Sequence, residues 1–104
     1  MKIEVVMKKT KVKVDAKAIY DSETKEMIVK KGSIVSEDVS QAKTFRGAKS
    51  ILKAREGVIG EGCKLLKDVS FKSSSTAGNF VTGRSTDGLS SWKTLDGKKL
   101  KEVL

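Results

Sequence analysis

The sequence predicts a small α+β domain, with small antiparallel sheets or hairpins packed against two main helices and a short C-terminal helix. Apolar and polar residues alternate in the first third of the chain, which is typical of strands. A helical spacing of apolar residues follows, and glycine, serine and aspartate mark the turns of a chain that has no proline. Its 104 residues are expected to form one domain, because a chain of this length buries enough surface for a single core.

Residues 1–36 are predicted to be mainly strands. In KVKVDAKAIY (11–20) every second residue is apolar, which indicates a strand with one buried face. DSETKE (21–26) is a polar turn and MIVKKGSIV (27–35) is a second extended run, so together they predict an antiparallel hairpin. Residues 3–7 supply another apolar run, which we expect at the edge of the same sheet.

Residues 40–57 are predicted to form the first main helix. Apolar residues recur there at spacings of three and four, as on one side of a helix: Phe45, Ala48, Ile51 and Leu52. Gly57 is expected to end the helix, since glycine adopts the left-handed conformation that closes a last turn. The opposite face carries a basic stripe of Arg46, Lys49 and Lys53. Such a stripe is either a solvated surface or a contact with anions.

The remaining residues divide into a hairpin over 58–71 and a helix–turn–strand–helical turn unit over 72–104. Two short apolar runs about the glycines at 60–62 indicate the hairpin. LSSWKT (89–94) is predicted to be a short strand, and Asp96 is expected to begin the final helical turn.

The second main helix lies at the start of this C-terminal unit. Ser73 or Ser74 can cap its first turn, and Gly83 can end it. Gly78 falls inside the helix, where glycine costs about 1 kcal/mol relative to alanine. We therefore expect another backbone or a ligand to come close to Gly78, with packing on the sheet as the commoner cause.

The composition argues against several classes of function. The chain has no histidine and one cysteine, so it lacks the usual general base, the His-paired nucleophiles and the ligand set of a zinc site. We therefore expect no enzyme activity, no cofactor and no metal. A lone cysteine cannot form an internal disulfide, which suits the reducing cytoplasm. No apolar run is long enough for a signal peptide or a membrane span.

The charge of the chain predicts an anionic partner. Twenty-two basic residues against 13 acidic ones give a formal net charge of +9. A protein this basic is expected to bind nucleic acid in the first place, and an acidic protein in the second. A lysine-rich surface that only keeps the protein soluble is the alternative.

Residues 71–104, FKSSSTAGNFVTGRSTDGLSSWKTLDGKKLKEVL, resemble the C-terminal half of a bacterial domain-of-unknown-function family. The resemblance rests on a Gly-Arg-Ser-x-[Asn/Asp]-Gly…Trp signature, which occupies 83–92 here. That family is known as an appendage of GIY-YIG nucleases and of restriction-modification proteins, and it is distantly similar to the RAMA domain. The resemblance implies an accessory role with nucleic acid. Leu89 departs from the family, which often has tryptophan there, and no nuclease precedes the domain in this chain.

Within this segment, Arg84 with its neighbours Ser85 and Thr86 is the best candidate for contact with a ligand. The planar guanidinium suits a phosphate or the edge of a guanine. The structural alternatives are that Arg84 pairs with Asp87 or caps the end of the preceding helix.

Two further features of the segment have both a functional and a structural interpretation. Ser74 and Ser75 begin a helix whose amide groups and positive dipole end can hold a phosphate, or they simply cap that helix. Trp92 is a stacking surface for a base if it is exposed, and a core residue if it is buried.

Together these observations predict a non-catalytic nucleic-acid-binding accessory module, with DNA as the first candidate. The candidate contacts are Arg84, Ser85, Thr86, Ser74, Ser75, Arg46, Lys49, Lys53 and Trp92. The alternative is a protein-interaction module that docks an acidic partner, such as the nuclease or methylase of a defence system. Nothing in the sequence specifies an oligomeric state.

Overall fold

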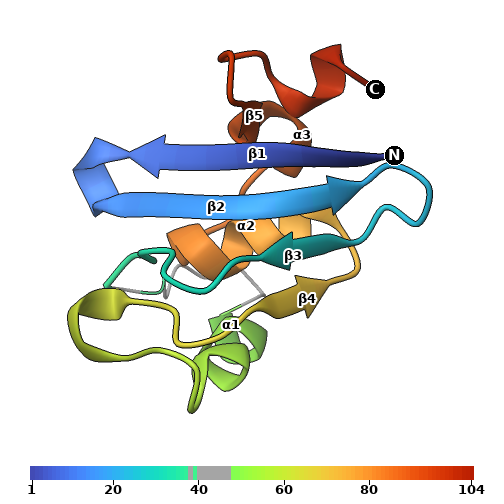
Figure 1. Ribbon diagram of the computed structural model, residues 1–104. Helices are drawn as coiled ribbons and strands as arrows, with labels where there is room; N and C mark the ends of the chain where they lie inside the picture. The colour runs from blue at the N-terminus through green and yellow to red at the C-terminus, as the bar shows by residue number, and fades with distance from the viewer. Residues whose placement is uncertain (38, 40–47) are drawn as a thin grey trace.

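The computed structural model describes residues 1–37, 39 and 48–104. In this part of the chain, five strands form one antiparallel sheet in the order β4-β3-β2-β1-β5 (Figure 1). The strands are β1 (Lys2–Lys9), β2 (Val14–Asp21), β3 (Met27–Val29), β4 (Val69–Phe71) and β5 (Lys93–Thr94). The helices are α1 (Ala48–Arg55), α2 (Ser74–Thr82) and α3 (Gly88–Ser91), with short 3-10 turns η1 (Thr10–Val12), η2 (Glu61–Cys63) and η3 (Leu100–Glu102). The predicted α+β class is confirmed.

The core lies between one face of the sheet and helix α2. The alternation predicted for residues 11–20 is seen in β2, where every second residue from Val14 to Tyr20 is buried. Val5 and Met7 of β1 lie opposite Ala18 and Ala16 of β2, so both strands present their apolar residues to the same side. Helix α2 covers this side with buried residues, namely Ala77, Phe80 and Val81.

The structure corrects two expectations about the first strands. Strand β2 begins at Val14 rather than at residue 11, because Thr10–Val12 coil into η1 and Lys13 adopts a left-handed conformation with φ 55°. Strand β1 is not an edge strand, because β5 pairs with its outer side. That pairing joins segments near the two ends of the chain, so no local pattern in the sequence predicts it.

The segment predicted as one hairpin over 58–71 is divided in two. A single bridge between Ile59 and Leu65 closes a small hairpin about η2. Val69–Phe71 instead pairs with β3. Asp68, directly before β4, joins the two segments: its carboxylate accepts hydrogen bonds from the Lys31 amide at 2.7 Å and the Lys30 ammonium at 2.9 Å.

Helix α2 begins and ends as its sequence predicts. The Ser73 hydroxyl caps the first turn by accepting a hydrogen bond from the Thr76 amide at 3.1 Å. Gly83 ends the helix with φ 71°, and its amide donates to the Asn79 carbonyl at 2.8 Å. Both positions suit their residues, because serine is a preferred N-cap and glycine adopts positive φ without a steric cost.

Arg55 ties the end of α1 to the end of α2. Its guanidinium donates to the Phe80 carbonyl at 2.6 and 3.1 Å and to the Ser36 carbonyl at 2.8 Å. It also lies 5.8 Å from the centre of the Phe80 ring. Desolvation on burial lowers the pKa of Arg55 from its ordinary value. A buried charge needs such partners, and here the carbonyls at the negative end of the α2 dipole supply them.

Residues 89–94 form a helical turn and a two-residue strand rather than one strand. The Asp87 carboxylate accepts hydrogen bonds from the Leu89 amide at 3.1 Å and from the Ser90 hydroxyl at 3.0 Å, which caps α3. Trp92 follows this turn and is fully buried, and its indole Nε1 donates to the Ser74 carbonyl at 3.0 Å. The cap therefore outweighs the strand preference of the residues around Trp92.

Gly88 packs directly on the first turn of α2. A Cβ atom built on Gly88 would lie 2.2 Å from the Ser74 carbonyl carbon and 2.4 Å from the Ser75 amide nitrogen. Both neighbours are backbone atoms, which cannot rotate away as a side chain can. The contact is therefore possible only with glycine.

We predict that Gly88→Ala lowers the free energy of unfolding by about 3 kcal/mol or more, because a methyl group there overpacks two backbones. Gly60→Ala is the matched control. Its Cβ would meet only the Leu66 side chain, which is 52% exposed and free to turn away. The control should cost under about 1 kcal/mol. Urea unfolding of both variants measures the difference, and equal losses would contradict the close contact at Gly88.

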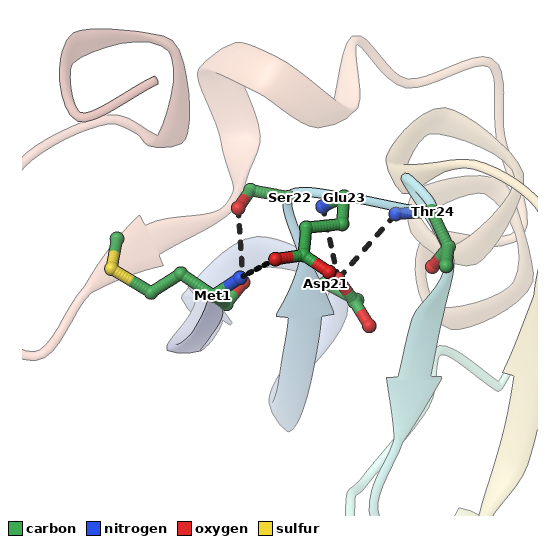
Figure 2. A network of polar contacts seen from close by, with 5 residues as sticks. All are labelled: Met1, Asp21, Ser22, Glu23 and Thr24. Atoms are coloured by element: carbon green, nitrogen blue, oxygen red, sulfur yellow. Dashed lines mark hydrogen bonds and ion pairs between the residues drawn. The ribbon is translucent and has the colours of Figure 1, made fainter.

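The turn between β2 and β3 is held by a small polar network (Figure 2). The Asp21 carboxylate accepts hydrogen bonds from the Glu23 amide at 2.9 Å and from the Thr24 amide at 3.4 Å. The Ser22 hydroxyl donates to the Met1 carbonyl at 3.0 Å, which fastens the start of β1 to the same turn. The hydrogen bond from the Glu23 amide in particular favours the ionised carboxylate and lowers the pKa of Asp21 below its usual 3.8.

This network predicts a dependence of stability on acid. Because the pKa of Asp21 is lower in the folded state, its contribution is complete above the unfolded value and is lost as pH falls through the folded value. Asp21→Asn should therefore flatten the fall in unfolding free energy below about pH 4. Glu26→Gln, in the same turn, is the control. Urea titrations at several pH values test this, and equal slopes for Asp21→Asn and the native chain would refute it.

Candidate functional site

The loop at 83–87, between α2 and α3, bends at Gly83 and Arg84 and then returns along α2. Gly83 lies at the end of α2, whereas Gly88 packs on its first turn, so the loop must run back along the whole helix. Nine helical residues span about 13 Å, and five extended residues reach about 17 Å. Little slack is left, and this fixes where the side chains of the loop are displayed.

Hydrogen bonds from α2 fix the loop along its length. The Thr86 amide donates to the Asn79 side-chain oxygen at 2.8 Å. The Arg84 amide donates to the Thr82 hydroxyl at 3.2 Å, and that hydroxyl lies 2.7 Å from the hydroxyl of Thr86. Threonine and asparagine in the helix thus replace the partners that a bare loop backbone would find in water.

Thr86 also explains the glycine inside α2. A Cβ atom on Gly78 would lie 2.9 Å from the Thr86 methyl carbon and 3.7 Å from the end of Met7. The close approach predicted at Gly78 is therefore made by a loop side chain and by the sheet. Thr86 is half-buried and its hydroxyl also contacts the Arg84 carbonyl at 3.1 Å, so Thr86 mainly holds the loop.

Arg84 is displayed by this loop with its guanidinium unpaired. The side chain is exposed, and in the described part of the chain it has no hydrogen-bond or ion-pair partner. Neither structural alternative for Arg84 is found: Asp87 caps α3 instead, and the end of α2 is capped by Arg55. Ser85 is exposed beside Arg84.

Lysines of the turn between β1 and β2 face the same loop. Arg84 lines a depression of about 560 Å³ together with Lys8, Lys9 and Lys11. Hydroxyl groups and one carboxylate complete its polar lining, from Thr10, Thr82, Ser85, Thr86, Asp87 and Ser91. Arg84 also lines a second depression of about 210 Å³. The lining of the second depression is Lys11, Val12, Lys13, Ser36, Glu37 and Arg84.

We call the two depressions together the basic groove, with Lys8, Lys9, Lys11, Lys13 and Arg84 as its cations. Its carboxylates are Asp87, whose oxygens are occupied in capping α3, and Glu37. None of the ion pairs among the described residues involves a cation of the groove. Uncompensated positive charge in a hollow attracts anions more strongly than the same charge on a flat surface.

The sequence did not point to the four lysines of the groove. Lys11 and Lys13 are polar positions of the alternating segment 11–20 and Lys8 and Lys9 precede it, so no local pattern places them beside Arg84. They meet Arg84 only because β1 and β2 turn back at η1, beside the loop that follows α2. The excess of basic residues near the N-terminus was the one available signal.

The start of α2 is not the phosphate site that Ser74 and Ser75 suggested. Ser74 is buried, and its carbonyl accepts a hydrogen bond from the indole N–H of Trp92. The Ser75 hydroxyl accepts a hydrogen bond from the Gly88 amide at 3.1 Å. Gly88 packs on the Ser74 and Ser75 backbone, so the groups expected to hold a phosphate make contacts within the fold instead.

Trp92 is likewise excluded as a stacking surface. Its exposed fraction is 0%, and both its ring and its N–H group are engaged in the core. A base cannot reach either face of the ring, so Trp92 belongs to the scaffold. The structural interpretation of the single tryptophan was the correct one.

The structure does not bring the basic stripe of the first helix to Arg84. Lys49 and Lys53 are exposed on α1, and neither lines the basic groove. Helix α1 and the turn between β1 and β2 stand well apart in Figure 1. Arg46 lies outside the described residues, as do the first residues of the helix predicted over 40–57.

The described ranges contain neither a candidate metal cluster nor a candidate membrane-spanning helix. No three histidine, cysteine or carboxylate side chains gather there closely enough to hold a metal ion. No helix in those ranges combines the length and the apolar character that crossing a bilayer requires. Cys63 is a free, half-buried thiol.

We predict opposite outcomes for the two arginines. Arg84→Ala should change the free energy of unfolding by under about 0.5 kcal/mol, because the substitution keeps the backbone hydrogen bonds and the exposed side chain has no partner among the described residues. Arg55→Ala should cost about 3 kcal/mol, because carbonyls at the end of α2 lose a charged donor. Thermal unfolding of both variants measures this. A large loss for Arg84→Ala would make Arg84 a structural residue.

The chain belongs to the family described as Domain of unknown function (DUF4357), which matches residues 6–104. The match includes every cation of the basic groove as well as α2 and α3. It confirms membership of a domain-of-unknown-function family, which the sequence of residues 71–104 had suggested. No curated protein and no solved structure matches the chain.

Proposed function

We propose that this member of the DUF4357 family is a non-catalytic module that binds nucleic acid, DNA in the first place, through the phosphate backbone. The observation that carries the proposal is the basic groove. There Arg84, whose guanidinium has no partner among the described residues, lies on a loop fixed by hydrogen bonds to α2 and faces lysines at the end of β1 and in the turn that follows. Lysine and arginine neutralise phosphates, and most protein–DNA hydrogen bonds go to phosphate and sugar oxygens.

The lining of the groove favours a phosphate backbone over an acidic protein. Protein interfaces centre on buried apolar and aromatic anchors. In the groove, Val12 is the one apolar side chain among the described lining residues, and the others are charged or carry a hydroxyl. Hydroxyl groups of serine and threonine are common donors to phosphate oxygens, so they support the cations in this role.

The resemblance of residues 83–92 favours an accessory role beside another protein or domain. Residues 83–92 resemble domains appended to GIY-YIG nucleases and restriction-modification proteins, in which chemistry belongs to another domain. An accessory role requires only that the module hold DNA, and the groove offers cations and hydroxyls rather than a nucleophile paired with a base. We place this role in the cytoplasm, where Cys63 would remain a thiol.

Fluorescence anisotropy with a labelled duplex tests the proposal. If the groove cations together neutralise between about two and five phosphates, the logarithm of the affinity should fall with the logarithm of salt concentration with a slope between about −2 and −4.5. Single-stranded DNA and RNA belong in the same panel. If no nucleic acid binds at about 50 mM salt, the proposal is wrong and an acidic protein partner becomes the leading candidate.

A pair of double variants locates the contact. Lys9→Glu with Lys11→Glu reverses two charges in the groove and should weaken duplex binding at least about tenfold. Lys49→Glu with Lys53→Glu makes the same change on the exposed face of α1 and should weaken it less than about threefold, through net charge alone. If the α1 variant loses more duplex affinity than the groove variant, the contact lies on α1 and not in the groove.

A further inference from the structure

Arg84 stands between the two depressions of the basic groove. Lys11, Val12 and Arg84 line both of them. Two hollows that share three lining residues have a common wall, so they lie side by side along one groove. Each hollow therefore offers a separate position next to the same guanidinium.

Each depression has its own charged residues. Lys8, Lys9 and Asp87 line only the larger depression, whereas Lys13 and Glu37 line only the smaller one. Counting the shared cations, four cations face one carboxylate in the larger depression, and three face one carboxylate in the smaller. Both are therefore positive, and volumes of 560 and 210 Å³ are several times the roughly 30 Å³ that one water occupies in the liquid.

We propose that the groove binds two phosphates of one polynucleotide strand, one in each depression, with Arg84 and Lys11 contacting both. The inference rests on the proposed function and makes its ligand specific: a run of phosphodiesters rather than a single phosphate group. The planar guanidinium can donate on two sides, which suits a position between two anions.

The bases of this strand would face away from the groove. Stacking needs an exposed aromatic ring, and no aromatic residue lines either depression in the described chain. Trp92, Phe80 and Tyr20 are buried in the core, and the ring of Phe71 packs against Phe80 with 4.9 Å between their centres. Contacts with phosphate alone carry no sequence information, so affinity should vary little among sequences.

Glu37 provides an unusual test, because its removal should improve binding. Its carboxylate is exposed in the smaller depression and has no hydrogen-bond or ion-pair partner in the described part of the chain. A phosphate bound there would be repelled by it. Increased affinity is also easier to interpret than a loss, because damage to the fold cannot cause it.

The experiment compares three neutralised variants with a control. Lys9→Gln acts only on the larger depression, Lys13→Gln and Glu37→Gln only on the smaller, and Lys101→Gln removes a distant exposed lysine that lines neither. Affinity for a labelled duplex of mixed sequence is measured by anisotropy between about 50 and 200 mM salt. Melting temperatures show that each variant is folded.

We expect Lys9→Gln and Lys13→Gln each to weaken binding about fivefold and to reduce the magnitude of the salt slope by up to about 0.9, because each removes one of the cations around one phosphate. Glu37→Gln should strengthen binding about twofold, and Lys101→Gln should have little effect. If Lys9→Gln weakens binding while Lys13→Gln and Glu37→Gln behave like Lys101→Gln, only one depression holds phosphate. The two-phosphate inference is then wrong and the proposed function stands. If the native chain binds no nucleic acid, the proposed function itself fails.

Discussion

The contact between Gly88 and the first turn of α2 determines the rest of the C-terminal half. It brings two backbones together where even a methyl group would not fit, and it places Trp92 so that its indole donates to the Ser74 carbonyl. With one end of the loop held there and the other at Gly83, the intervening residues must run back along α2. The position of Arg84 thus depends in part on packing at the opposite end of the helix.

The two arginines near α2 differ in burial and in their hydrogen-bond partners. Arg55 is half-buried and fully engaged with carbonyls, whereas Arg84 is exposed and unpaired within the described residues. Because Arg55 satisfies the Phe80 carbonyl and the Ser36 amide satisfies that of Val81, the negative end of α2 is largely neutralised. That helix end would otherwise oppose an anion near Arg84.

Local patterns in the sequence predicted the fold class, the buried face of β2 and both ends of α2, since alternation and capping act between near neighbours. Arg84 stays a predicted contact and is exposed, and of the two interpretations of Trp92 the core residue is the one that the structure shows. The sequence could not predict the pairing of β5 with β1 or the meeting of Arg84 with Lys8–Lys13, because these join distant parts of the chain. It also could not predict that Gly88 packs on the backbone of Ser74 and Ser75 at the start of α2.

We propose that nucleic acid contacts the end of β1 and the turn into β2, residues 8–13, together with the loop after α2. The most direct measurement is an amide NMR titration of the ¹⁵N-labelled protein with a short duplex. The account predicts that shifts concentrate at residues 8–13 and 83–87, with those of α1 (Ala48–Arg55) unchanged. Shifts that concentrate on α1, or that spread evenly over the surface lysines, would contradict it.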